Sequence, residues 1–160
     1  MLRKFGIIAV LSLMAVALAA VPAFAQEGLH FVGTPTVTAT KTDTTTFLTA
    51  NGEVAGAGRT ATATLSADAT VVTGCINPGS KSQQPKGLAR TTTPTVGTTT
   101  FNTRQGRGTF TVSTAPITLP GRTCPPPDEP VVVSVTYENV LLTITSQTGT
   151  ITQSFGTIDP

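Results

Sequence analysis

Residues 60–71 read Thr-Ala-Thr-Ala-Thr-Leu-Ser-Ala-Asp-Ala-Thr-Val. The odd-numbered positions are apolar, and every even-numbered position carries a hydroxyl or a carboxylate. Successive side chains of a β-strand point to opposite faces, so this period of two predicts a strand with one buried and one solvated face. Thr is β-branched and fits a half-buried pleated surface. The stretch therefore indicates an all-β chain.

The same alternation recurs on both sides of this stretch, and roughly one residue in four after Ala25 is Thr. No segment after Ala25 has the apolar spacing of an amphipathic helix. Turn residues separate the expected strands, which are 30–33, 36–42, 45–55, 59–72, 87–92, 95–101, 108–115, 131–138, 140–147 and 150–156. About eight to ten short strands in one domain predict an antiparallel two-sheet sandwich, broadly immunoglobulin-like. A closed barrel is the competing architecture.

The expected core is thin, because many inward positions carry only Ala. Its larger members are Phe31, Val37, Phe47, Leu65, Val71, Phe101, Phe110, Val112, Val133, Val135, Leu142, Ile144, Ile151 and Phe155.

The N-terminus reads as an export signal. Arg3 and Lys4 precede an apolar run that ends near Val21, and a small-residue cleavage motif closes at Ala25. This order is typical of a cleaved signal peptide over residues 1–25. Cleavage between Ala25 and Gln26 would leave a single domain, 26–160, secreted or periplasmic. The rest of the chain has no second long apolar run, so we expect no membrane span in the mature protein.

Export changes the charge balance. The chain has 10 Lys and Arg against 8 Asp and Glu, and a formal net charge of +2. Loss of Arg3 and Lys4 leaves eight of each sign, because 10 − 2 = 8. The remaining cations are spread along the chain, whereas a nucleic-acid groove needs clustered cations with stacking aromatics. We therefore expect no nucleic-acid partner.

The two cysteines, Cys75 and Cys124, border two loops that lack apolar periodicity, 76–87 and 120–130. An even cysteine count in an exported chain predicts a structural disulfide. Such a bond would tie the two loops together into one ordered surface, which is the candidate binding surface. The candidate binding residues on these loops are Asn77, Lys81, Gln83, Lys86, Asp128 and Glu129.

No catalytic constellation is recognisable. His30 is the only histidine and lies close to the expected mature N-terminus, which makes it a poor triad base. The chain has no GxSxG elbow, P-loop or GxGxxG motif. We therefore expect no catalytic residues, cofactor or metal. A small secreted hydrolase that uses a pair of its eight carboxylates is the alternative.

Several short motifs resemble a family of small secreted bacterial proteins of unknown function, of actinobacterial type. The matching segments are 31–35, 48–58, the Cys-x-Asn-Pro-Gly loop 75–79, Cys124-Pro125 and the C-terminal hairpin 144–155. Ser80 stands where the family has a second Gly, and 126–128 departs from its usual sequence. The resemblance implies no activity, so no functional residue carries over.

The composition is also similar to that of fimbrial subunits, which are exported, Thr-rich sandwiches with one disulfide. The C-terminal segment 155–160 lacks the aromatic-ended strand expected of them. The sequence favours a noncatalytic secreted module that binds an extracellular or cell-surface ligand or has a structural role there. A pilin-like assembly subunit is the other alternative beside the hydrolase.

Overall fold

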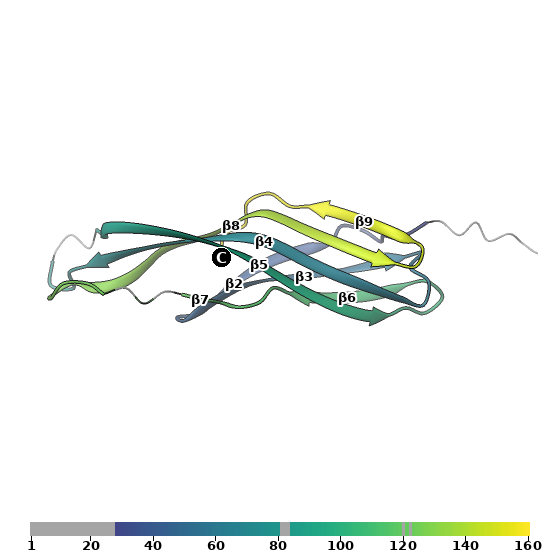
Figure 1. Ribbon diagram of the computed structural model, residues 1–160, viewed down its shortest axis with the longest axis horizontal. Coiled ribbons are helices and arrows are strands. Elements are labelled where there is room, and N and C mark those ends of the chain that lie inside the picture. The colour runs from purple at the N-terminus through teal and green to yellow at the C-terminus, as the bar shows by residue number, and fades with distance from the viewer. Residues whose placement is uncertain (1–27, 81–83, 120, 122) are drawn as a thin grey trace, which may run out of the picture.

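The computed structural model describes residues 28–80, 84–119, 121 and 123–160; the expected leader, 1–25, lies outside them. These residues form two antiparallel sheets and contain one disulfide, and the arrangement of the sheets confirms the two-sheet sandwich (Figure 1). Sheet A contains β1 (His30–Phe31), β2 (Thr36–Lys41), β3 (Thr45–Ala55), β6 (Gly108–Ser113) and β7 (Ile117–Thr118). Sheet B has the order β5 (Lys86–Asn102), β4 (Thr60–Ile76), β8 (Glu129–Ser146) and β9 (Gly149–Ser154). Within the described part, no helix could serve as a membrane span.

Sheet A is built around β3. β1 and β2 pair with one edge of this strand, and β6 and β7 pair with the other. Because β3 is the only strand that contacts all the others, it fixes the register of the whole sheet. The first residue of β3, Thr45, pairs with Thr118 of β7, and sheet A ends there.

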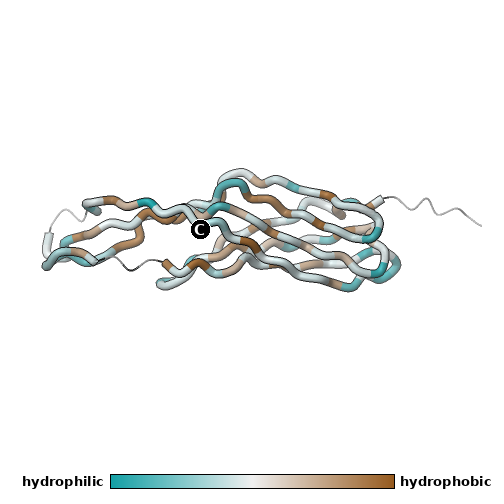
Figure 2. Tube along the Cα trace, viewed as in Figure 1, coloured by the Kyte–Doolittle hydropathy of each residue, from teal (hydrophilic) through white to brown (hydrophobic). Residues whose placement is uncertain are grey.

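The strand β4 sits between β5 and β8 and is regular over its full length. The odd-numbered residues of β4, from Ala61 to Cys75, are all buried, as the alternation predicts. Those from Ala61 to Ala69 face sheet A, where Leu48 and Val54 are fully buried. Figure 2 shows the apolar residues of the sandwich as short brown segments separated by pale ones along the strands. Small Ala side chains on β4 allow the two sheets to lie close together.

Two pairs of strands expected to be separate are continuous. The segments 87–92 and 95–101 form the single strand β5, and 131–138 and 140–147 form β8. The Val96 carbonyl points to the outer edge of β5, because it accepts from the Ala115 amide. Backbone groups two residues apart point to the same edge, so the Pro94 nitrogen also faces outward. Its missing N–H therefore costs no hydrogen bond to β4. In β8, a bulge at Asn139 (φ 54°) interrupts the alternation without ending the strand.

Pro94 in β5 and the bulge at Asn139 in β8 lie side by side across sheet B, on the two sides of Asp68. Asp68 of β4 is opposite Pro94 on one side and Glu138 on the other, and the Asn139 side-chain Nδ2 donates to Asp68 Oδ2 at 2.8 Å. Beyond this level, sheet B continues past the end of sheet A as three strands (Figure 1). We call this extension the arm; it consists of residues 70–76, 86–92 and 129–136.

Two of the expected core positions are wrong. Phe47 points out of the sandwich, because its neighbours Thr46 and Leu48 are the buried ones. Val133 is 42% exposed, because it is the extra residue of a second bulge in β8. Thr46 can replace an apolar residue in the core because its hydroxyl bonds the Tyr137 hydroxyl at 2.8 Å and donates to the Thr40 carbonyl at 3.0 Å.

Tyr137, the only tyrosine of the chain, is fully buried where the arm leaves the sandwich. Burial raises its pKa above the ordinary value of 10.0, and the hydrogen bond with Thr46 opposes part of that rise. The neutral phenol is therefore favoured by folding. The resulting stability is present below pH 10.0 and is lost as the pH rises through the folded-state pKa, because the unfolded chain ionises first.

We predict that phenolate absorbance in the native protein appears only above the pH at which the denatured protein titrates. Thr46→Val should raise the pKa of Tyr137 further, because it removes the hydrogen bond that lowers it. Ultraviolet titration of native and denatured protein measures both effects. Coincident titration curves would contradict the buried position.

Gly97 allows the two sheets to touch at one side of the sandwich. A Cβ at this position would lie 1.7 Å from the Ser113 carbonyl oxygen. The close approach lets the Ala115 amide donate to the Val96 carbonyl at 3.0 Å, and the Thr95 hydroxyl donate to the Ala115 carbonyl at 2.9 Å. These bonds cover the outer edge of β5 at the sandwich end of the strand.

We predict that Gly97→Ala lowers the free energy of unfolding by about 3 kcal/mol, because a methyl group cannot fit against backbone atoms. Gly156→Ala is the matched control, since nothing lies within 4 Å of the added Cβ. Chemical denaturation of both variants gives the comparison, and an equal response of the two would refute the close approach.

Candidate binding site

The two cysteine-bordered loops meet at the tip of the arm. Cys75 of β4 is opposite Lys86 on one side and Pro130 on the other, and Ile76 is opposite Glu129. The expected disulfide between Cys75 and Cys124 is confirmed, with the two Cα atoms 5.8 Å apart. The register and the disulfide therefore bring the ends of both loops into one region.

The candidate residues on these loops have different surroundings. Asn77 belongs to a turn, because its Oδ1 accepts from the Gly79 amide at 2.9 Å. Asp128 closes another turn, in which its amide donates to the Pro125 carbonyl at 2.9 Å. Lys86 and Glu129 are exposed at the first positions of β5 and β8. The other two candidates, Lys81 and Gln83, lie outside the described residues.

The connection between β7 and β8, described at 119, 121 and 123–128, begins at sheet A and ends at the tip of the arm. It leaves β7 with Leu119, whose amide donates to the Thr44 carbonyl at 2.8 Å, and Cys124 attaches it to β4. The chain then turns and returns as β8. The disulfide therefore holds the connection beside the arm.

We predict that the double variant Cys75→Ala, Cys124→Ala loses about 4 kcal/mol of unfolding free energy in the chain-entropy model, given a sequence separation of 49. Chemical denaturation of oxidised wild type, reduced wild type and the variant measures the loss. The reduced wild type is the control for the substitutions themselves. Equal stability of all three would contradict a structural role for the bond.

A hollow of about 490 Å³ lies between this connection, the arm and the end of sheet A. We call it the slot. Three segments line it: the β2–β3 hairpin Lys41–Thr44, Leu119 with Gly121, and Pro130–Val132 at the start of β8. Its volume is within the range of about 300–1,000 Å³ that is common for ligand sites.

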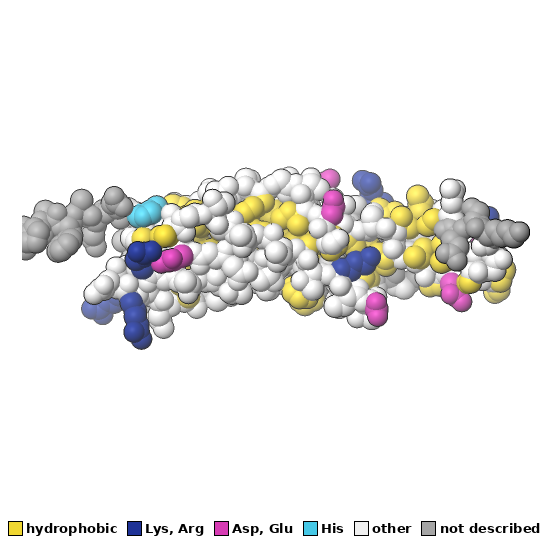
Figure 3. All heavy atoms as spheres, turned by 180° about the vertical axis from the view of Figure 1, so that it is seen from behind, with side chains coloured by type: hydrophobic (Ala, Val, Ile, Leu, Met, Phe, Trp, Pro, Cys, Tyr) yellow, Lys and Arg dark blue, Asp and Glu magenta, His cyan; other side chains and the backbone are white. Residues whose placement is uncertain are grey.

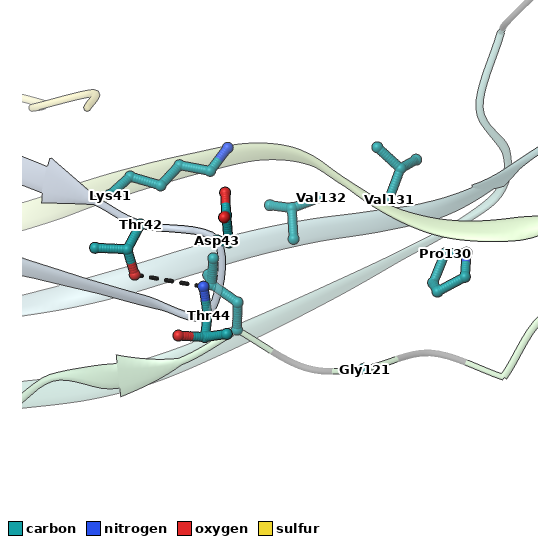
Figure 4. A pocket seen from close by; sticks show the side chains of 9 residues that line it. Lys41, Thr42, Asp43, Thr44, Gly121, Pro130, Val131 and Val132 are labelled. Carbon is teal, nitrogen blue, oxygen red and sulfur yellow. Dashed lines mark hydrogen bonds between the residues drawn. The ribbon is translucent and has the colours of Figure 1, made fainter.

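The hairpin wall of the slot is held by its own hydrogen bonds. The Thr42 hydroxyl accepts from the Thr45 amide at 2.9 Å, and the Thr42 amide donates to the Thr45 carbonyl at 2.8 Å. Figure 4 shows Lys41 and Asp43 extending from this hairpin on the side that faces Val132. The slot therefore combines a cation, an anion and two hydroxyls at one end with apolar walls.

Sequence reasoning missed the slot. Lys41 and Thr42 belong to the expected strand 36–42, and Asp43 and Thr44 lie between it and the next expected strand. No motif connects them to Val131–Val132. The one signal was the run of three valines after a Pro-rich loop, because it breaks the alternation seen elsewhere.

The remaining polar groups are dispersed. Figure 3 shows charged side chains scattered between broad uncharged areas on the face that it presents. Asp68 and Glu138 are neighbours, but both belong to one face of sheet B, where a second hollow of about 460 Å³ is lined by Asp68 and Asn139 among others. Glu53 pairs with Arg107 at 2.9 Å. His30 Nδ1 lies 2.8 Å from the Gly28 carbonyl. Among the described residues, no group of three His, Cys, Asp or Glu could hold a metal ion.

Comparisons with known proteins give little further guidance. No family model matches the chain, and no curated protein matches it. Among solved structures, the chain is similar to part of the crystal structure of Bacteroides uniformis beta-glucuronidase, with 14% identity and a TM-score of 0.36. That match covers 81% of this chain and 14% of the glucuronidase chain.

Proposed function

We propose that this protein is an exported, noncatalytic binding module that acts at the cell surface or in the surrounding medium, with the slot as its contact site. The sequence of the leader supports export. The Cys75–Cys124 disulfide supports an oxidising compartment, because such bonds are rare in the reducing cytosol.

The observation that carries the proposal is the construction of the slot. Its three walls come from segments far apart in the sequence, and the disulfide and the hairpin hydrogen bonds hold two of them. A site held in place before the ligand arrives loses less conformational entropy on binding. The fold therefore supplies a preorganised concave surface where a flat sheet face would offer none.

The chemistry of the slot favours a ligand with both polar and apolar parts. Lys41 and Asp43 offer one charge of each sign, and the Thr42 and Thr44 hydroxyls can donate or accept. Leu119, Pro130 and Val132 offer apolar contact. Peptides have this combination of properties.

We predict that nuclear magnetic resonance titration with panels of short peptides and oligosaccharides identifies a ligand class that shifts the amides of Lys41–Thr44 and Val131–Val132. Lys41→Ala should weaken that binding, because it removes the cation of the slot. Arg59→Ala is the control, since Arg59 is an exposed cation just before β4. Mass spectrometry should find each panel unchanged after incubation.

Two outcomes would refute this proposal. Turnover of any panel member would show an enzyme. Shifts confined to the outer sheet faces, or no shifts at saturating concentrations, would remove the slot as the contact site.

A further inference from the structure

Three turns lie together at the end of the sandwich opposite the arm, where β4 begins (Figure 1). The Ala57 amide in the β3–β4 turn donates to the Gly106 carbonyl in the β5–β6 turn at 3.0 Å. The Thr148 hydroxyl in the β8–β9 turn donates to the Gly56 carbonyl in the β3–β4 turn. These hydrogen bonds hold the three turns as one surface. We call it the base; it consists of residues 56–59, 103–107 and 147–148.

The base carries three exposed arginines, Arg59, Arg104 and Arg107. Arg104 and Arg107 are opposite each other across the β5–β6 turn, where their backbones exchange two hydrogen bonds of 2.8 and 3.0 Å. The Thr103 amide donates to the Arg59 carbonyl at 2.9 Å, so Arg59 lies beside the same turn. Like charges at directly opposite positions destabilise a pair of strands. The fold gains no stability from the Arg104–Arg107 pair, so an external ligand explains its positive charge better.

One described acid lies among these cations. Glu53 Oε1 is 2.9 Å from the Arg107 guanidinium, and Arg59 and Arg104 have no ion pair with a described residue. The other described acids lie where the arm begins or beyond it: Asp43, Asp68, Asp128, Glu129, Glu138 and Asp159. Glu27 lies outside the described residues. Figure 3 shows dark blue side chains gathered at the end of the molecule that carries the histidine. The base is therefore positive, although the expected mature chain has equal numbers of cations and acids.

The chemistry of the base favours phosphate. The planar guanidinium of Arg can donate two parallel hydrogen bonds to phosphate oxygens, and it is less strongly hydrated than an ammonium group. The turns of the base contain no aromatic residue. Sites for single-stranded nucleic acid combine cations with aromatic side chains on which bases stack. The base thus fits phosphate groups presented on a surface rather than stacked bases.

The chain enters the fold beside the base. His30 of β1 pairs with Ala55, the last residue of β3 before the β3–β4 turn. The expected leader ends at Ala25, only a few residues before His30. The apolar core of a leader inserts into the membrane during export. Export through this leader would bring the base next to the membrane surface, where phospholipid headgroups carry phosphate.

We propose that the base docks on anionic phospholipid at the surface of the membrane across which the chain is exported. Arg59 and Arg104 bind the headgroup phosphates, while Arg107 remains paired with Glu53. Each cation near an anionic surface strengthens binding roughly fivefold, so the contact is reversible. β4 runs from the base to the tip of the arm, so the docked protein directs the slot into the surrounding medium. The contact is separate from the slot and does not depend on the function proposed for it.

The test uses the full mature protein and vesicles of phosphatidylglycerol and phosphatidylcholine in equal parts. Sedimentation should show the protein bound to these vesicles at low ionic strength, because the negative surface potential attracts the cations of the base. Binding should weaken as salt is added, because exposed charges are screened. Vesicles of phosphatidylcholine alone, which carry no net charge, should bind little protein.

A pair of double variants locates the contact. Arg59→Gln with Arg104→Gln should weaken vesicle binding roughly twentyfold, because two cations of the base are lost. Lys86→Gln with Arg90→Gln is the matched control, since it removes two exposed cations from β5 in the arm and leaves the same net charge. All four side chains are exposed, so each double variant should keep the fold, which circular dichroism checks.

Three results would overturn the proposal. The first is no binding to the anionic vesicles at low ionic strength, and the second is an equal loss of binding in the two double variants. The third is binding of soluble polyphosphate without binding to vesicles, which would identify a soluble polyanion as the occupant. None of these results bears on the slot, which the titration with peptides and oligosaccharides tests separately.

Discussion

The structure depends on the pairing of β4 with its two neighbours. β4 is the most regular strand of sheet B: its buried and half-buried residues alternate from Ala61 to Ala69, and the bulges of the sheet lie in β5 and β8. Because a one-residue slip would exchange its buried and solvated faces, the register of β4 is fixed by burial. β4 therefore extends as one continuous strand from the sandwich into the arm.

The arm and the slot follow from this continuity. Sheet A ends at the β2–β3 hairpin, while β4 continues to Cys75. The chain must then return from β7 to the tip of the arm to begin β8, and the disulfide attaches this connection to the end of β4. The space that remains between the connection, the hairpin and β8 is the slot. A difference in length between two sheets thus produces a concave site.

Much of the fold could be predicted from the sequence, because period-two patterning and turn residues are local signals. The alternation in 60–71 gave the faces of β4, and the cysteine count gave the disulfide. The strand boundaries at Pro94 and Asn139 were predicted wrongly, because whether a strand can continue through either residue depends on its neighbours. Pro94 lies at an uncovered edge, and Asn139 has Asp68 as a hydrogen-bond partner. The position of Phe47 in the core was predicted wrongly, because its neighbour Thr46 is buried through hydrogen bonds to Tyr137 and to the Thr40 carbonyl. The slot depends on where sheet A ends relative to the arm, and no local pattern encodes that.

The central claim is that arm and sandwich form one continuous sheet along β4. Native-state hydrogen exchange of the β4 amides tests it most directly. The account predicts that Thr70–Thr73 in the arm are protected together with Ala63 and Leu65 in the sandwich, because both sets are paired on both sides. Exchange of the arm amides near unprotected rates, while the sandwich amides stay protected, would contradict it.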